Sequence, residues 1–195
     1  MTIGAALFSS SDAEWETPRE VFRPLHREFK FTLDVAATAR NAMVRRYYDR
    51  ALDGLSQVWR GRCWLNPPYG EPEQPCRTTH TAPRPHHGTA CKKKRCAARG
   101  WHTDVYIPGA VDFIQHAAQA AHAGTAQVVV CLLPARTDTA WFHDWVMRAA
   151  EVRLIRGRLS FVGAPSAAPF PSMVVVFRGR LRPPSRPPRF TAWDL

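Results

Sequence analysis

The chain has 195 residues, 45% of them hydrophobic, with a formal net charge of +11 and an isoelectric point near 10.2. This length and composition are typical of one globular domain with an ample core, and so basic a balance favours a polyanionic partner such as nucleic acid. No stretch approaches the roughly 18 apolar residues of a membrane span, and the first residues lack the basic and apolar regions of a signal peptide. We therefore expect a cytoplasmic protein whose five cysteines are thiols or metal ligands rather than disulfides.

The first clear signal along the chain is a helix start. Thr17, Pro18 and Glu20 follow the pattern of a helix N-cap, a proline at the first helical position and a capping box. Apolar residues then recur at helical spacing and predict a helix from about 18 to 29 with one buried face: Val21, Phe22, Leu25 and Phe29. Taken alone, the Thr-Pro pair indicates a helix start and no more.

Residues 31–38 form a short apolar run that ends in small side chains. The run predicts a buried strand, and the end of the first strand in an open α/β sheet is where the backbone approaches a cofactor. The glycine-rich fingerprint of dinucleotide-binding folds is missing. Asp34 would then act through its carboxylate, either on a cationic ligand group or as an acceptor within its own loop. Asp53, in the turn before the strand at 62–66, is expected at the same edge of the sheet.

The predicted strand at 62–66 ends in the motif Asn66, Pro67, Pro68 and Tyr69. Because proline cannot donate to a sheet ladder and restricts the residue before it, the strand must stop here and leave a rigid polar tip. The Asn66 side-chain oxygen and the Pro67 carbonyl offer two hydrogen-bond acceptors beside the Tyr69 ring, which suits a planar group bearing an amine. The alternative is that Asn-Pro is only a turn signal.

Residues 71–107 differ in composition from the rest of the chain. Between Cys76 and His102 lie seven Lys and Arg residues, no acidic residue and no apolar periodicity, so we interpret the segment as an insertion into the domain. Its Cys and His residues suit one tetrahedral zinc ion, although the long first gap differs from that of a standard zinc finger. The predicted ligands are Cys76, Cys91, Cys96 and His102, with His80, His86 and His87 as competing candidates.

The alternative for this segment is a flexible basic loop without metal. The run Lys92, Lys93, Lys94 and Arg95 would then simply contact phosphate. Both interpretations favour nucleic acid as a partner.

An alanine-rich amphipathic helix closed by Gly124 and an apolar strand at 127–133 follow the insertion. Because this strand would run beside the strand at 62–66 in a βαβ unit, residues 135–139 are expected at the edge that carries Asn66. The guanidinium of Arg136 in this loop is suited to binding a phosphate or the edge of a base. The alternative is that Arg136 is a solvated loop residue without a binding role.

Two further apolar runs, at 152–156 and 172–177, are joined by a connection too short for a crossover helix. They predict an antiparallel pair at one edge of the sheet. The last stretch, 178–195, is a basic tail rich in Pro and Arg, and its residues 178–189 predict an extended basic arm.

With these parts in place, the chain resembles the phage-type family of DNA N6-adenine methyltransferases, which use S-adenosylmethionine. Asn-Pro-Pro-Tyr alone also occurs in enzymes that methylate RNA adenine or protein glutamine, so the longer match around PARTDTAWFH is the more specific part. The likeness covers most of the chain outside the insertion and rests on EWETPREVF (14–22), FTLDVAAT (31–38), DGL (53–55), NPPYG (66–70), LLPARTDTAWFHDWV (132–146), RGRLSF (156–161) and PSMVVVF (171–177).

The resemblance implies a single domain over 1–195 with a Rossmann-like methyltransferase fold: a mostly parallel seven-stranded sheet, a C-terminal antiparallel hairpin and helices on both faces. It implies that Asn66, Pro67, Pro68 and Tyr69 act on an adenine flipped out of double-stranded DNA. It also implies that the Asp34 loop lies near the cofactor methionine and Asp53 near the cofactor adenine. The implied cofactor-binding residues are Thr17, Pro18, Asp34, Ala36 and Asp53, and the expected DNA contacts are Arg136 and the run 92–95.

Two other functions stay open. The same fold could methylate RNA adenine or a protein glutamine amide, whose NH2 group presents the same two hydrogens. Alternatively, residues 76–102 and the arginine-rich tail could belong to a zinc-stabilised nucleic-acid-binding protein without catalysis. No sequence pattern indicates an oligomer, and we assume a monomer.

Overall fold

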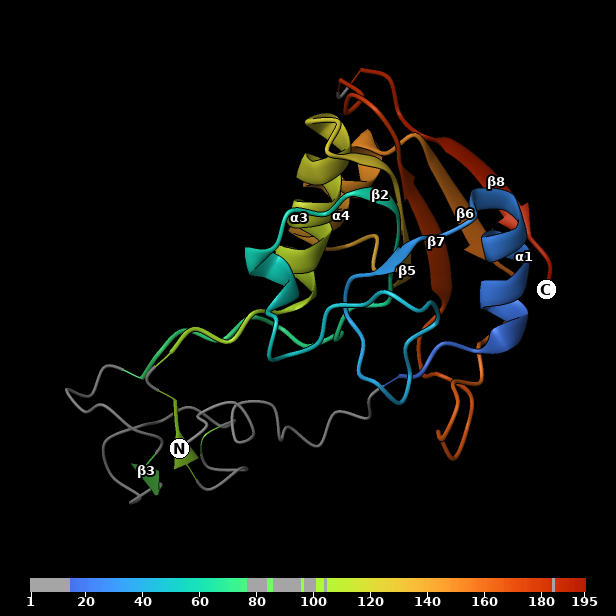
Figure 1. Ribbon diagram of the computed structural model, residues 1–195. Helices are drawn as coiled ribbons and strands as arrows, with labels where there is room; N and C mark the ends of the chain where they lie inside the picture. Colours follow the sequence, from blue (N-terminus) through green and yellow to red (C-terminus); the bar gives the residue numbers. More distant parts are fainter. Residues whose placement is uncertain (1–14, 77–83, 86–95, 97–100, 104, 184) are drawn as a thin grey trace.

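The computed structural model describes residues 15–76, 84–85, 96, 101–103, 105–183 and 185–195. These residues form a mixed α/β fold around a six-stranded sheet with the strand order β1-β2-β5-β7-β6-β8 (Figure 1). The strands are β1 (Leu33–Asp34), β2 (Gly61–Leu65), β5 (Ala126–Pro134), β6 (Glu151–Ile155), β7 (Ser172–Phe177) and β8 (Arg189–Trp193). A separate antiparallel pair, β3 (Arg84–Pro85) and β4 (Trp101–His102), belongs to the 71–107 segment.

Helices cover both faces of this sheet (Figure 1). On one face lies α1 (Arg19–Phe29), which confirms the helix predicted from residue 18 to 29. On the other face lie α3 (Ala110–His122) and α4 (Ala140–Asp144), together with the short turns η2 (Gly54–Ser56) and η3 (Val146–Arg148). Side chains alternate along a strand, so β2 contributes Trp64 to the core under α1, and Cys63 and Leu65 to the core under α3.

Strands β1, β2 and β5 are parallel, with Leu33 opposite Cys63 and Leu65 opposite Cys131. The carboxyl ends of these three strands therefore meet at one edge of the sheet, as the sequence predicts. In an open α/β sheet this edge is where ligands bind.

The C-terminal side of the sheet differs from the prediction. β6 and β7 are antiparallel, as expected, but they are not the edge, because β8 pairs with β6 in parallel and follows them in the chain. Among the described residues the sheet thus has six strands, so the expected seventh is not confirmed, and the end of the tail forms a strand at 189–193 that was not predicted. Tertiary contacts stabilise β8: Arg189 pairs with Glu151 at 2.9 Å, and Trp193 packs against the core under α1.

The start of α3 is fixed against the residues that follow Tyr69. The Ala110 amide donates to the Gly70 carbonyl at 2.9 Å, and the Gly109 amide donates to the Asp112 carboxylate at 2.8 Å. A β-carbon on Gly109 would collide with the backbone of Gly70 and Pro72. Only glycine permits this approach, so Gly109 joins α3 to the polar tip after β2.

Among the helices in the part of the chain that the structure describes, none has both the length and the apolar character needed to cross a membrane.

Candidate active site

Asn66 comes directly after β2, and its side-chain amide is held in one orientation. Its Nδ2 donates to the Trp15 carbonyl at 2.5 Å and to Thr17 Oγ1 at 3.1 Å. Both amide hydrogens therefore have acceptors, which fixes Oδ1 on the opposite side of the group. The predicted end of the strand is confirmed within one residue, since β2 stops at Leu65.

The role of Thr17 corrects the sequence-based prediction of a helix cap. The N-cap of α1 is Pro18, and no side chain caps the helix there. Thr17 is buried, and its hydroxyl instead accepts a hydrogen bond from Asn66. A Ser or Thr hydroxyl can accept from any donor that the fold brings near it. Here the buried Asn66 amide, rather than a backbone N–H at the start of α1, donates to Thr17.

A short N-terminal segment, Trp15–Thr17, delivers these contacts. Its middle residue, Glu16, accepts a backbone hydrogen bond from Val162 at 3.2 Å and pairs with Arg40 at 2.7 Å. The segment thus lies between the end of β2 and the connection from β6 to β7, and sequence reasoning did not anticipate it.

Tyr69 reaches back to the same amide. Its hydroxyl lies 2.8 Å from Asn66 Oδ1 and 3.2 Å from the Leu132 carbonyl of β5, and it can donate its one proton to either. Burial raises the pKa of Tyr69 well above its usual value, so the hydroxyl stays protonated and acts as a donor. When it donates to Leu132, Asn66 Oδ1 is available to a substrate amine.

The half-buried Tyr69 ring belongs to an aromatic cluster beside Asn66. Its centroid lies 5.5 Å from that of Phe170 and 6.1 Å from that of Phe161, both edge-on. Trp15 completes the cluster, at 5.0 Å from Phe161 and 5.6 Å from Phe170. The sequence predicted an aromatic ring here from Tyr69 alone, because Phe161 and Phe170 come from the 157–171 connection, which shows no periodic pattern.

Asp34, at the carboxyl end of β1, is almost fully buried and serves its own loop. Its Oδ2 accepts from the Met43 amide at 3.0 Å, and its Oδ1 accepts from the Ala36 amide at 3.5 Å. Burial raises the pKa of Asp34 to about 6, against the lowering effect of these two hydrogen bonds. The hydrogen-bonding role left open by the sequence is present, and the predicted contact with a cationic ligand group remains a prediction.

Asp53 lies in a turn that packs against the end of β1. It adopts a left-handed conformation with φ of 47°, and its side chain accepts from the Leu55 amide at 3.3 Å. The next residue, Gly54, lies so close to the Val35 carbonyl that a β-carbon there would collide with it. The Asp53 turn and the Asp34 loop are therefore neighbours at one edge, as predicted.

The other predicted residues surround this edge. Pro18 is buried at the start of α1, Pro67 is buried, Pro68 is exposed and Ala36 is half-buried. The residues that sequence reasoning assigned to catalysis and to the cofactor thus come from the ends of β1 and β2, the Asp53 turn and the segment before α1.

Arg136 follows β5 at the same edge, as the parallel pairing of β2 and β5 predicts. Its side chain is 57% exposed, and its only nearby acid among the described residues is Asp138, at 3.7 Å. An exposed pair of this length contributes little to stability, so Arg136 is available to an anionic partner. The predicted contacts Lys92, Lys93, Lys94 and Arg95 lie outside the described residues.

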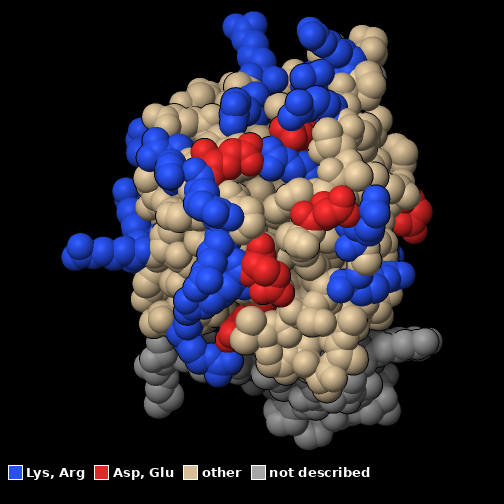
Figure 2. Space-filling view, turned by 90° about the vertical axis from the view of Figure 1, so that its right-hand side faces the viewer, with Lys and Arg blue, Asp and Glu red and all other residues tan. Residues whose placement is uncertain are grey.

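Basic side chains also gather on the side of the molecule that carries α1 and β8 (Figure 2). Acidic groups neutralise part of this charge: Arg153 pairs with Glu28 at 2.6 Å and with Glu151 at 2.8 Å. Arg156 pairs with Asp194 at 2.9 Å.

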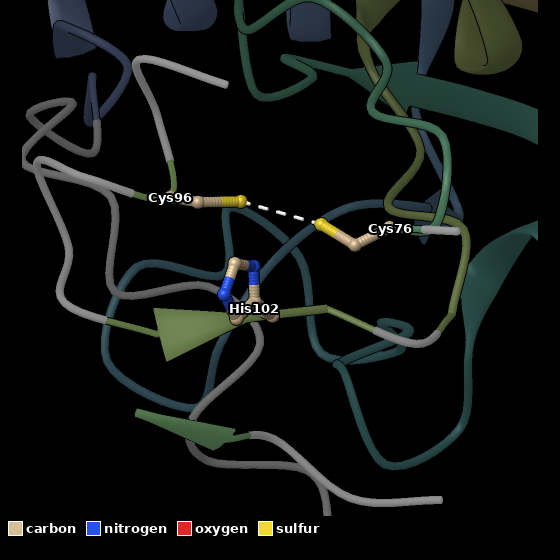
Figure 3. A group of neighbouring side chains, drawn as sticks. All are labelled: Cys76, Cys96 and His102. Atoms are coloured by element: carbon tan, nitrogen blue, oxygen red, sulfur yellow. Dashed lines mark hydrogen bonds between the residues drawn. The ribbon is translucent and has the colours of Figure 1, made fainter. Parts of the chain in front are cut away.

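Three of the four predicted metal ligands come together in the structure. Cys76, Cys96 and His102 are buried, and their ligand atoms lie within 4.8 Å of one another. Figure 3 shows the two thiols pointing toward each other with the His102 ring beside them. The fourth predicted ligand, Cys91, lies outside the described residues, as do His80, His86 and His87.

The fold and the site place the chain in a class of α/β proteins in which an Asn-Pro-Pro-Tyr motif follows a central parallel strand. Comparison with known families then identifies the family. The sequence profile of the family "DNA N-6-adenine-methyltransferase (Dam)" matches residues 5–185, and the chain belongs to this family.

Two curated phage proteins are similar to the chain. The DNA N-6-adenine-methyltransferase of Escherichia phage T1 is 27% identical over 149 residues, which are 75% of this chain and 46% of that protein. The DNA N-6-adenine-methyltransferase of Haemophilus phage HP1 (strain HP1c1) is 39% identical over 61 residues, which are 30% of this chain and 35% of that protein. The chain therefore matches less than half the length of each relative. No solved structure matches it significantly.

Proposed function

We propose that this chain methylates the N6 amine of adenine in double-stranded DNA, with S-adenosylmethionine as the methyl donor. The observation that carries the proposal is the Asn66 amide, whose two hydrogens are bound by Trp15 and Thr17 and whose oxygen lies beside Tyr69. Membership of the adenine methyltransferase family supports the same assignment.

The chemistry requires two acceptors in fixed positions. The N6 lone pair of adenine is delocalised into the ring, so the amine is a poor nucleophile. Asn66 Oδ1 and the Pro67 carbonyl each accept one N6 hydrogen, which favours a pyramidal nitrogen with a localised lone pair. This lone pair would attack the methyl carbon of S-adenosylmethionine, so that the new N–C bond forms as the S–C bond breaks and S-adenosylhomocysteine leaves. The methylated amine would then lose one proton to water. No side chain is needed as a general base, because positioning and electrostatics carry the catalysis.

Tyr69 has two tasks in this scheme. Its hydroxyl donates to the Leu132 carbonyl when the adenine amine occupies Asn66 Oδ1. Its ring, with Phe161, Phe170 and Trp15, offers aromatic surface to a base that has left the duplex. This surface and basic contacts to the backbone offset the few kcal/mol that unstacking costs.

The residues around Asp34 fit the methyl donor. S-adenosylmethionine supplies an electrophilic methyl group on a positively charged sulfonium, and it also carries an ammonium group. A buried carboxylate with a raised pKa is stabilised in its ionised form by a nearby cation. We assign the methionine part to the Asp34 loop with Ala36, and the cofactor adenine to the Asp53 turn. Thr17 and Pro18 border the same edge.

Transfer of label from methyl-labelled S-adenosylmethionine to unmethylated DNA tests the proposal. We expect label on adenine N6 with the native chain and with Gln119→Ala, which alters an exposed amide on α3. Asn66→Ala should abolish transfer and largely retain DNA binding. A folded, cofactor-binding protein that labels no DNA of any sequence would refute the assignment.

Competition among acceptors separates DNA from the alternatives. DNA, RNA and protein from one lysate are offered together, and label is measured on each. Label mainly on RNA adenine or on protein glutamine would keep the chemistry of Asn66 and reject the proposed substrate. Sequencing methylated DNA from cells that express the chain would then identify the target site.

A further inference from the structure

We propose that Cys76, Cys96 and His102 form a structural binding site for one divalent metal ion of the zinc class, at the base of the 71–107 segment and separate from the Asn66 site. The three side chains are buried, with relative exposures of 6%, 0% and 9%. Thiolate sulfur and imidazole nitrogen are the ligands that zinc prefers in structural sites.

The distance between the two sulfurs favours a shared metal over a disulfide. Cys76 Sγ and Cys96 Sγ lie 3.4 Å apart. A disulfide would place them at about 2.05 Å, whereas two thiolates on one tetrahedral zinc ion, with Zn–S bonds of ~2.3 Å, lie ~3.8 Å apart. All three ligand atoms lie within 4.8 Å of one another, so small side-chain rotations suffice to bring them onto one ion.

Backbone pairing at the two ends of the segment brings two of the ligands together. Glu73 and Ile107 form an antiparallel bridge, and the Cys76 amide donates to the Thr103 carbonyl at 2.8 Å. Cys76 therefore lies beside His102, which is itself part of strand β4. This pairing fixes the backbone positions of Cys76 and His102 relative to each other.

A buried carboxylate adjoins the three ligands. Glu73 is 7% exposed, and its Oε1 lies 3.8 Å from Cys96 Sγ. Two thiolates next to a buried carboxylate would be costly without a cation, and a divalent ion offsets this charge. Glu73 lies outside the group of three ligands and beside Cys96, where it is placed to orient that thiol from outside the ligand set.

Such an ion would link residues that are far apart in the sequence. Cys96 lies twenty residues beyond Cys76, and the segment between them lacks the apolar periodicity that could form a core. Because the free energy of metal binding contributes directly to folding, the ion would stabilise the part of the insertion that Cys76, Cys96 and His102 hold together.

Metal analysis of the full chain, purified without chelator, tests the site. We expect about one zinc per chain, and more than ~100-fold weaker zinc affinity in Cys76→Ser and Cys96→Ser. Cys63→Ala is the matched control, since Cys63 is a buried thiol in β2; it should retain the metal.

A second measurement covers the case in which the serine variants do not fold. Cobalt(II) replaces zinc in the native chain, and a tetrahedral site with two thiolates should give sulfur-to-cobalt charge-transfer absorption and intense d–d bands. A folded native chain that binds neither metal, or a Cys76–Cys96 disulfide found by mass spectrometry in protein kept under reducing conditions, would overturn the site. Neither outcome bears on methyl transfer by Asn66, which is measured separately.

Discussion

The orientation of the Asn66 amide decides what the candidate site can do. If the group were flipped, its NH2 would face the Tyr69 hydroxyl and an incoming amine, and its oxygen would face the Trp15 carbonyl. The Thr17 and Tyr69 hydroxyls could reverse their roles, but the Asn66 oxygen would meet the Trp15 carbonyl, acceptor against acceptor, at a cost of about 1–3 kcal/mol for a buried group left unsatisfied. The contact of Nδ2 with the Trp15 carbonyl therefore fixes the orientation.

Thr17→Val tests whether Thr17 acts through Asn66 or through the cofactor. The valine has nearly the same shape but cannot accept from Nδ2, so we expect a loss of about tenfold in turnover, as for one hydrogen bond worth about 1.4 kcal/mol. Cofactor affinity should stay close to native, and Thr17→Ser should restore turnover. A variant with normal turnover and weakened cofactor affinity would place Thr17 in the cofactor site instead.

Asp34 gives the site a pH dependence. Because burial raises its pKa to about 6, the carboxyl is largely protonated at pH 5 and largely ionised at pH 7. A cationic cofactor prefers the ionised form, so its affinity should rise between pH 5 and pH 7 and then level off. Calorimetric titration with S-adenosylmethionine measures this change, and Asp34→Asn should bind more weakly with a flat profile. Equal pH dependence in the native chain and the variant would remove Asp34 from the cofactor site.

The close packing between α3 and the polar tip makes Gly109 sensitive to any side chain. In Gly109→Ala the new β-carbon meets the backbone of Gly70 and Pro72, so the helix must move away from the tip. We expect a loss of about 1–3 kcal/mol in the free energy of unfolding, together with reduced methyl transfer.

Gly124→Ala is the control for this change. Gly124 has a φ of 75° and open space around it, so alanine there costs about 1 kcal/mol of backbone strain without moving the tip. Chemical denaturation and turnover, measured on both variants, separate the two effects. If Gly124→Ala impairs turnover as much as Gly109→Ala, the link between α3 and the tip is not the cause.

Most elements were predictable because their own side chains specify them. The helix Arg19–Phe29 and the strand Ala126–Pro134 have clear apolar patterns. Strand β8 was missed because it is short, directly follows Pro187 and Pro188, and is largely exposed at the edge of the sheet, so it lacks the apolar run of a buried strand. Likewise, the Thr17 hydroxyl had two possible partners, a helix end and a distant amide, and only the folded chain decides between them.

The distribution of charge over the whole molecule bears on where DNA binds. The α1 and β8 side is basic (Figure 2), but acidic partners neutralise Arg153 and Arg156 there. Arg136, beside the Asn66 edge, has a longer ion pair, at 3.7 Å against 2.6 Å for Arg153 and 2.9 Å for Arg156. We therefore expect DNA to approach the Asn66 edge rather than the α1 side.

Salt dependence of DNA binding tests this orientation. Replacing Arg136 by Ser should reduce the slope of log affinity against log salt by about 0.9. Replacing the exposed Arg19, Arg23 and Arg27 of α1 by Ser is the comparison, and it should change the slope little. The reverse pattern would place the DNA on the α1 side.

The hydrogen bonds from Asn66 to Trp15 and Thr17 have a consequence for protein engineering. These residues precede Asn66 by 51 and 49 positions, and they lie ahead of the first helix, so their loss removes no strand or helix of the fold. Removing the residues before Pro18, by truncation or by a protease, should yield material that looks intact by circular dichroism yet has little turnover. An affinity tag is better fused after Leu195, which is exposed beyond β8.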